Sequence, residues 1–287
     1  MVEVADGVQL WAEESGDPEG SPLLLVMGAN ASSATWPTGL VTGLGAHHRV
    51  IRYDHRDTGR STTSVGPPTY AIRDLAPDAL AVLDAFGVDR AHVLGMSMGG
   101  TLVQLLLLDA AHRLLSATLL ATSALGSGLA GDGTDGLPGV SDRLLELWQS
   151  MADDRDEDAE LAWRVEHWRV LNGDVLPFDA DEFRAMESRA ATHAGTWHAP
   201  TAHAVAAQDG LDRGHELRAV AVPTLVVQAP EDPINPPPHG RHLAGLIPSA
   251  TLVSVPGMGH ALPGSVVPEL VAAVTHHTLS VDRTVPS

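Results

Sequence analysis

The stretch Val93–Gly100 constrains the possible folds more than any other part of the chain. It has the sequence V-L-G-M-S-M-G-G, and an apolar, helix-like run from Thr101 to Leu108 follows at once. An apolar strand thus leads through Gly-x-Ser-x-Gly into a helix, which is the context of a nucleophile elbow. Gly95 and Gly99 leave room for a tight backbone that side chains would obstruct. Ser97 is therefore the candidate nucleophile, projecting above a sheet.

A Gly-x-Ser-x-Gly match is weak evidence by itself, because the chain contains 28 glycines and an ordinary turn can produce the pattern. Two further residues strengthen it. An apolar strand over 223–228 is followed by Asp232, and another over 251–255 is followed by His260. Open parallel sheets carry their sites beyond the carboxyl ends of such strands. The sequence therefore predicts a Ser97–Asp232–His260 triad, in the chain order that this elbow requires.

The predicted triad implies a division of roles. His260 would take the proton of Ser97 and return it to the leaving group, while Asp232 would hold the imidazole in the correct tautomer. Glu231 is adjacent and is the rival acid. An oxyanion hole needs two converging backbone N–H donors. We expect one from Met98, the residue after the nucleophile, and the other from Gly28, with Ala29 as the alternative.

The remaining strand and helix patterns alternate along the chain. Apolar strands are expected over 23–27, 49–54 and 114–121, and an amphipathic helix over 74–86. This alternation predicts an α/β fold, a mostly parallel sheet with helices on both faces. Residues 2–14 are expected to form two short strands around the Asp6-Gly7 turn.

The pattern changes after residue 124. Residues 125–139 are rich in glycine and predict a loop, and residues 142–210 are polar, charged and helical in period. We therefore expect an inserted helical cap over 125–215, between two parts of the core at 1–124 and 216–287, which covers the site. A frayed tail is expected over 282–287.

Composition limits the partners. The formal net charge is −19, which disfavours nucleic acid and anionic membranes as partners, and a small-molecule substrate is expected instead. The chain contains no cysteine, so disulfides and thiolate metal sites are excluded. No signal peptide or apolar run of membrane-spanning length is visible, which favours a cytoplasmic location. Monomer and homodimer both remain open.

Fifteen histidines are present, and most are expected to be structural or exposed. The pairs His47-His48 and His276-His277 are typical of surface residues. His239 and His242 could share one helix face and bind a metal, but the HExxH pattern is absent and packing is the favoured interpretation. We expect neither a metal nor a cofactor.

Several large side chains could line a substrate pocket. Met27, Met96 and Met258 lie beside predicted site residues, and flexible thioethers suit an adaptable apolar pocket. Packing behind the elbow is an equally good interpretation. Trp148 lies in the predicted cap, where aromatic walls would suit a large flat substrate. The alternative is that this tryptophan belongs to the core of the cap.

Five segments of the chain together resemble α/β hydrolases. They are the elbow, residues 24–28, residues 51–61 (I-R-Y-D-H-R-D-T-G-R-S), residues 239–248 and residues 256–263. Within that fold they are most similar to the aclacinomycin-type methylesterases of anthracycline biosynthesis. The resemblance implies hydrolysis of a methyl ester on an aromatic polyketide through an acyl-enzyme. It also implies Ser97 as nucleophile, Asp232 as acid, His260 as base, and Gly28 and Met98 in the oxyanion hole. An acid product beta to a carbonyl could then lose carbon dioxide.

Other functions use the same triad. A general esterase, a lactonase, a C–C hydrolase and a cofactor-free peroxidase remain alternatives that the three residues do not separate. Dehalogenases and epoxide hydrolases are disfavoured, because they use a carboxylate where this chain has Ser97. The least favoured alternative is a binding protein that carries the triad without turnover.

Overall fold

The computed structural model describes residues 1–130, 136–151, 153–198 and 200–284. Its centre is a seven-stranded sheet in the order β3-β5-β4-β6-β7-β8-β9. The strands are β3 (Ala12–Gly16), β4 (Ser21–Val26), β5 (His48–Tyr53), β6 (Ala91–Met96), β7 (Leu114–Leu120), β8 (Thr224–Gln228) and β9 (Ala250–Ser254). All neighbours are parallel except the edge pair β3 and β5. The predicted α/β class with a mostly parallel sheet is confirmed.

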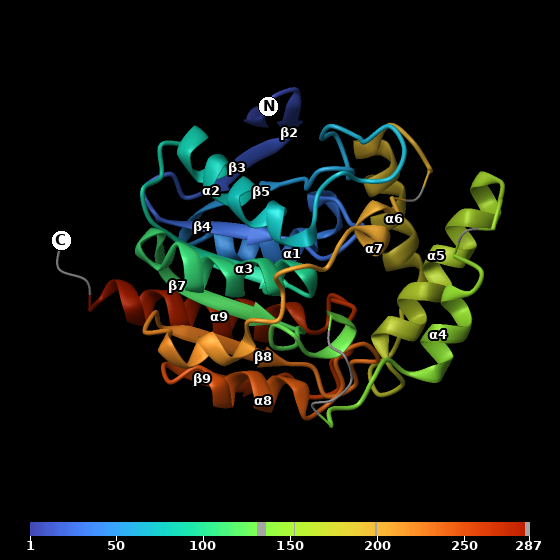
Figure 1. Ribbon diagram of the computed structural model, residues 1–287. Coiled ribbons are helices and arrows are strands. Elements are labelled where there is room, and N and C mark those ends of the chain that lie inside the picture. The colour runs from blue at the N-terminus through green and yellow to red at the C-terminus, as the bar shows by residue number, and fades with distance from the viewer. Residues whose placement is uncertain (131–135, 152, 199, 285–287) are drawn as a thin grey trace.

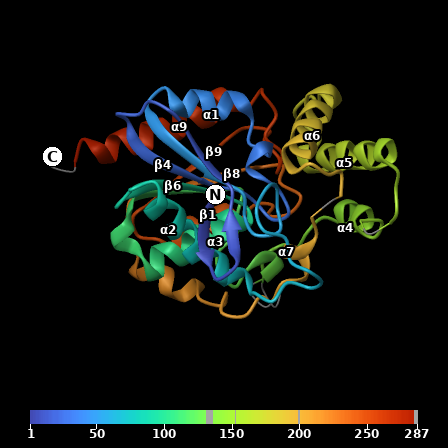
Figure 2. The same cartoon turned by 90° about the horizontal axis from the view of Figure 1, so that it is seen from above.

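Helices cover both faces of the sheet (Figures 1 and 2). One face carries α1 (Thr38–Gly45) and α9 (Val267–Asp282), and the other carries α2 (Ala76–Ala85), α3 (Met98–Asp109) and α8 (His239–Leu246). Two apolar cores result, one on each side of the strands. The central strand β6 is buried along its whole length, as a parallel strand covered on both faces must be.

The N-terminal segment differs in part from the expectation of two strands over 2–14. β1 (Val2–Ala5) and β2 (Val8–Leu10) form the expected antiparallel hairpin. A third strand, β3, follows immediately and pairs with β5 at the edge of the main sheet. The strand over 12–16 was not expected as a separate element, because its side chains are partly covered or exposed and few apolar residues mark it.

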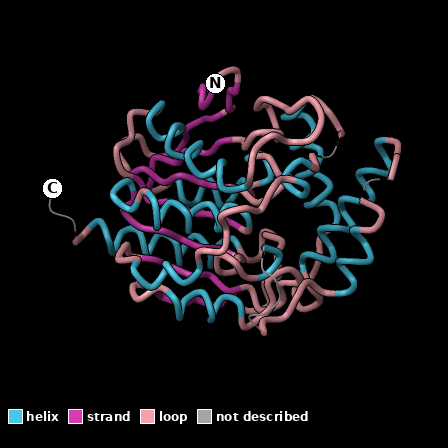
Figure 3. Tube along the Cα trace, viewed as in Figure 1, coloured by secondary structure: helices cyan, strands magenta, loops and turns pink. Residues whose placement is uncertain are grey.

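Helices and loops occupy the segment between β7 and β8 (Figure 3). They are α4 (Asp142–Trp148), α5 (Glu157–Asn172), α6 (Ala180–Ala194) and α7 (Ala202–Val205), with the short 3₁₀ turns η4 (Gly128–Ala130) and η5 (Gly214–Ala219). Within its described residues this segment adds no strand to the sheet. The division into a core and a cap at residues 125 and 215 stays a prediction, and residues 131–135 of the expected loop lie outside the described chain.

Helices α4, α5 and α6 lie beyond the carboxyl ends of the strands (Figures 1 and 2). Two contacts fix that position. The His260 backbone N–H donates to the Leu171 carbonyl of α5 over 2.7 Å, and His193 Nε2 of α6 lies 2.6 Å from the buried carboxylate of Asp54. The second contact joins α6 to the loop after β5. These helices therefore sit over the end of the sheet where the candidate residues gather.

The expectation of surface positions was wrong for His48. Its side chain is fully buried between α1 and α9, with Nδ1 3.0 Å from the Leu44 carbonyl oxygen and Nε2 2.8 Å from Thr278 Oγ1. The tail expectation also needs correction at Asp282. This residue ends α9 and accepts hydrogen bonds from Ser21 and His92. Residues 285–287 lie outside the described chain.

Candidate active site

The elbow has the geometry that the sequence predicts. Ser97 lies between β6 and α3 with φ 54° and ψ −123°, a region that side chains rarely adopt. Its N–H donates to the Leu120 carbonyl over 3.0 Å, and its carbonyl accepts from Thr122 Oγ1 over 2.9 Å. A Cβ on Gly99 would come within 2.6 Å of the Met27 carbonyl oxygen. Glycine is therefore required for α3 to approach β4 this closely.

Asp232 and His260 lie together at the carboxyl ends of β8 and β9. His260 Nδ1 lies 2.8 Å from Asp232 Oδ2, and both side chains are buried. The other carboxylate oxygen accepts the backbone N–H groups of Ile234 and Asn235 at 2.8 and 2.9 Å. An ionised carboxylate can only accept, so His260 Nδ1 carries the hydrogen and Nε2 is left to act as a base. This geometry favours Asp232 over Glu231 as the acid.

The loop after β4 lies against the nucleophile. A Cβ built on Gly28 would stand 3.3 Å from Ser97 Cβ and 3.8 Å from Ser97 Oγ, so the Gly28 backbone is adjacent to the hydroxyl. Met98 is the first residue of α3, where N–H groups have no partner within the helix. The positive end of the helix dipole also points toward Ser97. The role of Gly28 and Met98 as oxyanion donors stays a prediction that this placement supports.

The methionines expected near the site are buried in the core on the α1/α9 face. Met27 and Met96 are each 5% exposed, and Met258 is fully buried. This burial favours packing behind the elbow for Met258. Trp148 is only partly buried, and its Nε1–H donates to His167 Nε2 over 3.0 Å. A role for any of these four in substrate binding stays a prediction.

A histidine that the sequence analysis did not single out, His167, links α5 to Trp148 of α4 and lies near His260. His167 of α5 stacks on Trp163 at 5.4 Å, and burial, with a smaller effect of the neighbouring His260, lowers its pKa to about 4. His167 is therefore neutral at pH 7. It was missed because a lone histidine in a polar helix has no distinguishing pattern.

The loop after β5 contributes buried groups close to β4. His55 is fully buried, and its Nε2 lies 3.0 Å from the Met27 carbonyl oxygen. Burial lowers the pKa of His55 to about 3, so the ring is neutral. Asp54 accepts from the backbone N–H and hydroxyl of Ser33 and contacts His193. The hydrogen bonds hold the pKa of Asp54 below its ordinary value despite burial, which alone would raise it.

No grouping of three or more potential metal-binding side chains occurs within the described residues. His239 is buried with Nε2 2.8 Å from the Pro138 carbonyl oxygen. Among the described helices, none has the length and apolar character needed to cross a membrane.

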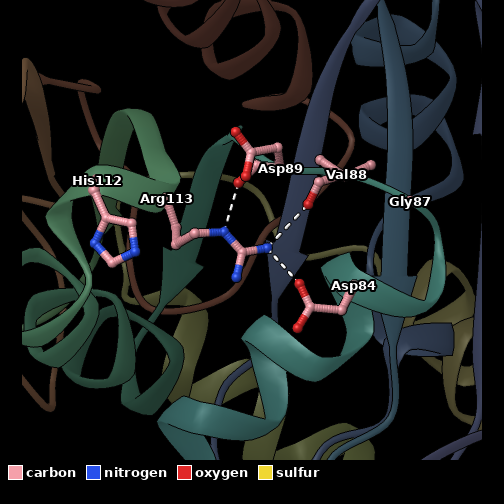
Figure 4. Close-up of a pocket in the computed structure, with 6 residues that line it drawn as sticks. All are labelled: Asp84, Gly87, Val88, Asp89, His112 and Arg113. Atoms are coloured by element: carbon pink, nitrogen blue, oxygen red, sulfur yellow. Dashed lines mark hydrogen bonds and ion pairs between the residues drawn. The ribbon is translucent and has the colours of Figure 1, made fainter.

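A surface hollow of about 380 Å³ lies at the opposite, amino ends of β6 and β7 (Figure 4). Its one guanidinium, Arg113, donates to the Asp89 and Val88 carbonyl oxygens and to Asp84. The Arg113 guanidinium is therefore already hydrogen-bonded to protein groups, and the hollow lies at the end of the sheet opposite to Ser97.

Comparison with known proteins agrees with this geometry. The family model described as alpha/beta hydrolase fold matches residues 21–263. Rhodomycin D methylesterase DauP of Streptomyces sp. strain C5 is 47% identical over 285 residues, covering 95% of this chain and 96% of the relative. Rhodomycin D methylesterase DnrP of Streptomyces peucetius shows the same identity and coverage.

Among solved structures, a hydrolase from Pseudomonas aeruginosa PA01 superposes with a TM-score of 0.70 at 27% identity. The match covers 98% of this chain and 97% of the other. The overall fold is thus shared with a hydrolase of known structure.

Proposed function

The chain belongs to the α/β hydrolase family, and we propose that it is a serine hydrolase that cleaves the methyl ester of an anthracycline-type polyketide. One observation carries the substrate class: the 47% identity to rhodomycin D methylesterases extends over 95% of the chain and so includes the segment over the site. The Asp232–His260 hydrogen bond and the strained Ser97 support the mechanism.

In the proposed reaction, Ser97 Oγ attacks the ester carbonyl as His260 Nε2 takes its proton. The Gly28 and Met98 N–H groups stabilise the oxyanion that forms. The tetrahedral intermediate collapses as His260 returns the proton to the methoxide, which leaves as methanol. Water, deprotonated by His260, then cleaves the acyl-enzyme and regenerates Ser97. The balance is one ester and one water consumed, one acid and one methanol formed.

The segment between β7 and β8 is proposed to cover the polyketide. Trp148, with the neighbouring Trp163 and His167, offers aromatic surface at the edge of the site. The methylesterase relatives support a small-molecule substrate. The cytoplasmic location, the monomeric or homodimeric state and the absence of nucleic acid and membrane partners stay predictions.

Mass spectrometry of the products tests the proposal. Wild type and Ser97→Ala are each incubated with rhodomycin D and with p-nitrophenyl acetate. We expect wild type to convert rhodomycin D to the free acid with release of methanol, and Ser97→Ala to lose at least about 10³-fold in rate while still binding the ester. Retained turnover in Ser97→Ala would refute the nucleophile.

The same assay separates the alternatives. Cleavage of p-nitrophenyl acetate without rhodomycin D would keep the esterase assignment and reject the polyketide. Enzyme-dependent loss of carbon dioxide from the acid would add a decarboxylation step to the reaction.

A further inference from the structure

A buried histidine outside the triad is bonded reciprocally to the loop after β4. The backbone N–H of Asn30 donates to His203 Nδ1 over 2.9 Å, and the backbone N–H of His203 donates to Asn30 Oδ1 over 3.0 Å. His203 Nε2 lies 3.0 Å from the Arg56 carbonyl oxygen, which can only accept. The imidazole is therefore neutral, with its hydrogen on Nε2. Its side chain is buried, and burial lowers its pKa.

This pair holds a backbone conformation that is otherwise unfavourable. Asn30 has φ 56°, in the left-handed region where asparagine is one of the few tolerated residues. It lies two residues after Gly28. On the other side of Gly28, the Met27 carbonyl accepts from His55. The short loop 27–30 is thus fixed at both ends by histidine rings that lie 5.7 Å apart.

We propose that His203 is a positioning residue that fixes Asn30 and thereby aims the Gly28 N–H at the oxyanion. The inference rests on the proposed ester hydrolysis, in which Gly28 is a donor. Stabilisation of the oxyanion depends on donors held at 2.7–3.1 Å from the place where charge develops. A loop that loses its anchor therefore loses transition-state stabilisation, while ground-state binding of the ester changes little.

The position of His203 also connects the loop to the cap segment. Helix α7 lies where the chain returns from the cap toward the core, and Ala207 accepts from the Ile72 N–H over 2.9 Å. One short stretch thus ends the cap segment and anchors the loop beside Ser97. The arrangement ties the catalytic geometry of the core to correct seating of the cap.

The test compares His203→Ala with His203→Asn, whose side-chain oxygen can accept near the position of Nδ1. Turnover of p-nitrophenyl acetate is measured per active site, titrated with a fluorophosphonate probe. We expect kcat of His203→Ala to fall about 10- to 100-fold with KM within about threefold, since loss of one whole oxyanion donor costs about 10²–10³. His203→Asn should recover to within about fivefold of wild type.

Phenylboronic acid supplies a readout that a purely structural role would not change. It forms a tetrahedral adduct on the serine, so its Ki should rise in proportion to the loss of kcat, whereas inhibition by the product acetate should not change. If His203→Ala folds poorly, Asn30→Gly keeps the left-handed backbone and removes only the Oδ1 acceptor. That variant should show a smaller loss of the same kind.

His48→Ala is the matched control, because His48 is another buried histidine with two hydrogen bonds, at the opposite end of the strands. It should lower Tm as His203→Ala does, yet leave kcat per active site and the boronate Ki unchanged. Equal kcat and Ki in wild type, His203→Ala and Asn30→Gly would overturn the inference alone. Failure of the probe to label wild-type Ser97 would overturn the proposed function, and the inference with it.

Discussion

Acid should weaken the attachment of α9 to the sheet through His92. This residue of β6 is fully buried, with Nδ1 2.8 Å from Ser116 Oγ and Nε2 3.0 Å from the carboxylate of Asp282 on α9. Burial lowers the pKa of His92 to about 4, although Asp282 opposes the shift. The close carboxylate alone would favour a charged imidazole, but the loss of solvation is larger. At neutral pH a neutral ring therefore donates Nε2–H to Asp282.

The sign and size of the effect follow from the proton balance. Between pH 6.5 and 4 the unfolded chain binds a proton at His92 that the folded protein does not bind, so stability is present above that range and is lost as pH falls. From pH 7.5 to 5.5 the free energy of unfolding should fall by about 1.3 kcal/mol through this one group. That interval stays above the sequence pI of about 5.0, where solubility is lowest.

Urea unfolding at pH 7.5 and 5.5 measures this contribution in wild type, His92→Gln and Ser116→Ala. The glutamine amide can still donate to Asp282 but does not titrate, so its fall in stability between the two pH values should be about 1.3 kcal/mol smaller than in wild type. Ser116→Ala loses a hydrogen bond and some stability but keeps the ring, so its fall should match wild type. An unchanged fall in His92→Gln would refute the reasoning.

Three further outcomes are expected. Asp232→Asn should lower kcat by about 10⁴-fold with KM little changed, because an amide no longer fixes the His260 tautomer. Steady-state kinetics on p-nitrophenyl acetate measure this effect. A loss of kcat below tenfold would contradict the assignment of Asp232 as the acid. His193→Ala should lower the free energy of unfolding by about 1–3 kcal/mol, because the buried Asp54 carboxylate loses a partner. Urea unfolding measures this change. An unchanged free energy of unfolding would show that water replaces the imidazole ring. Gly99→Ala should abolish ester hydrolysis and lower Tm, because the alanine Cβ would lie within 2.6 Å of the Met27 carbonyl oxygen. Normal activity of this variant would show that α3 can shift away from β4.

The regular elements and the candidate triad were predictable because local patterns mark them. Buried parallel strands are continuous apolar runs, so β6, β7 and β8 were placed to within about two residues. The rule that sites gather beyond the carboxyl ends of strands then selected Asp232 and His260, which the structure joins by a hydrogen bond. The order of the residues along the chain and their positions after strand ends were enough to identify the acid and the base, without any interatomic distance.

The buried histidines outside the triad were not predictable, because no local sequence pattern marks them. His203 and His55 act through backbone atoms of residues far away in the sequence, and backbone partners leave no mark on residue identity. His48 was expected at the surface because histidine is polar, yet a hydroxyl of α9 and a carbonyl of α1 satisfy both ring nitrogens. Burial of such a residue depends on which elements meet, which is a property of the assembled fold.

The order of the strands has an evolutionary consequence. β7 and β8 are hydrogen-bonded neighbours, from Ala117 opposite Thr224 to Leu120 opposite Val227, although residues 121–223 lie between them. The intervening chain needs only to leave one strand at its carboxyl end and return to the amino end of the next. Related sequences can therefore vary this segment without changing the strand pairing of the sheet, provided that they keep Thr122 and His203, whose side chains bond to Ser97 and Asn30. The cover of the site and the strands that carry the triad are thus separate stretches of sequence, and selection can act on one while the strand pairing of the other is kept.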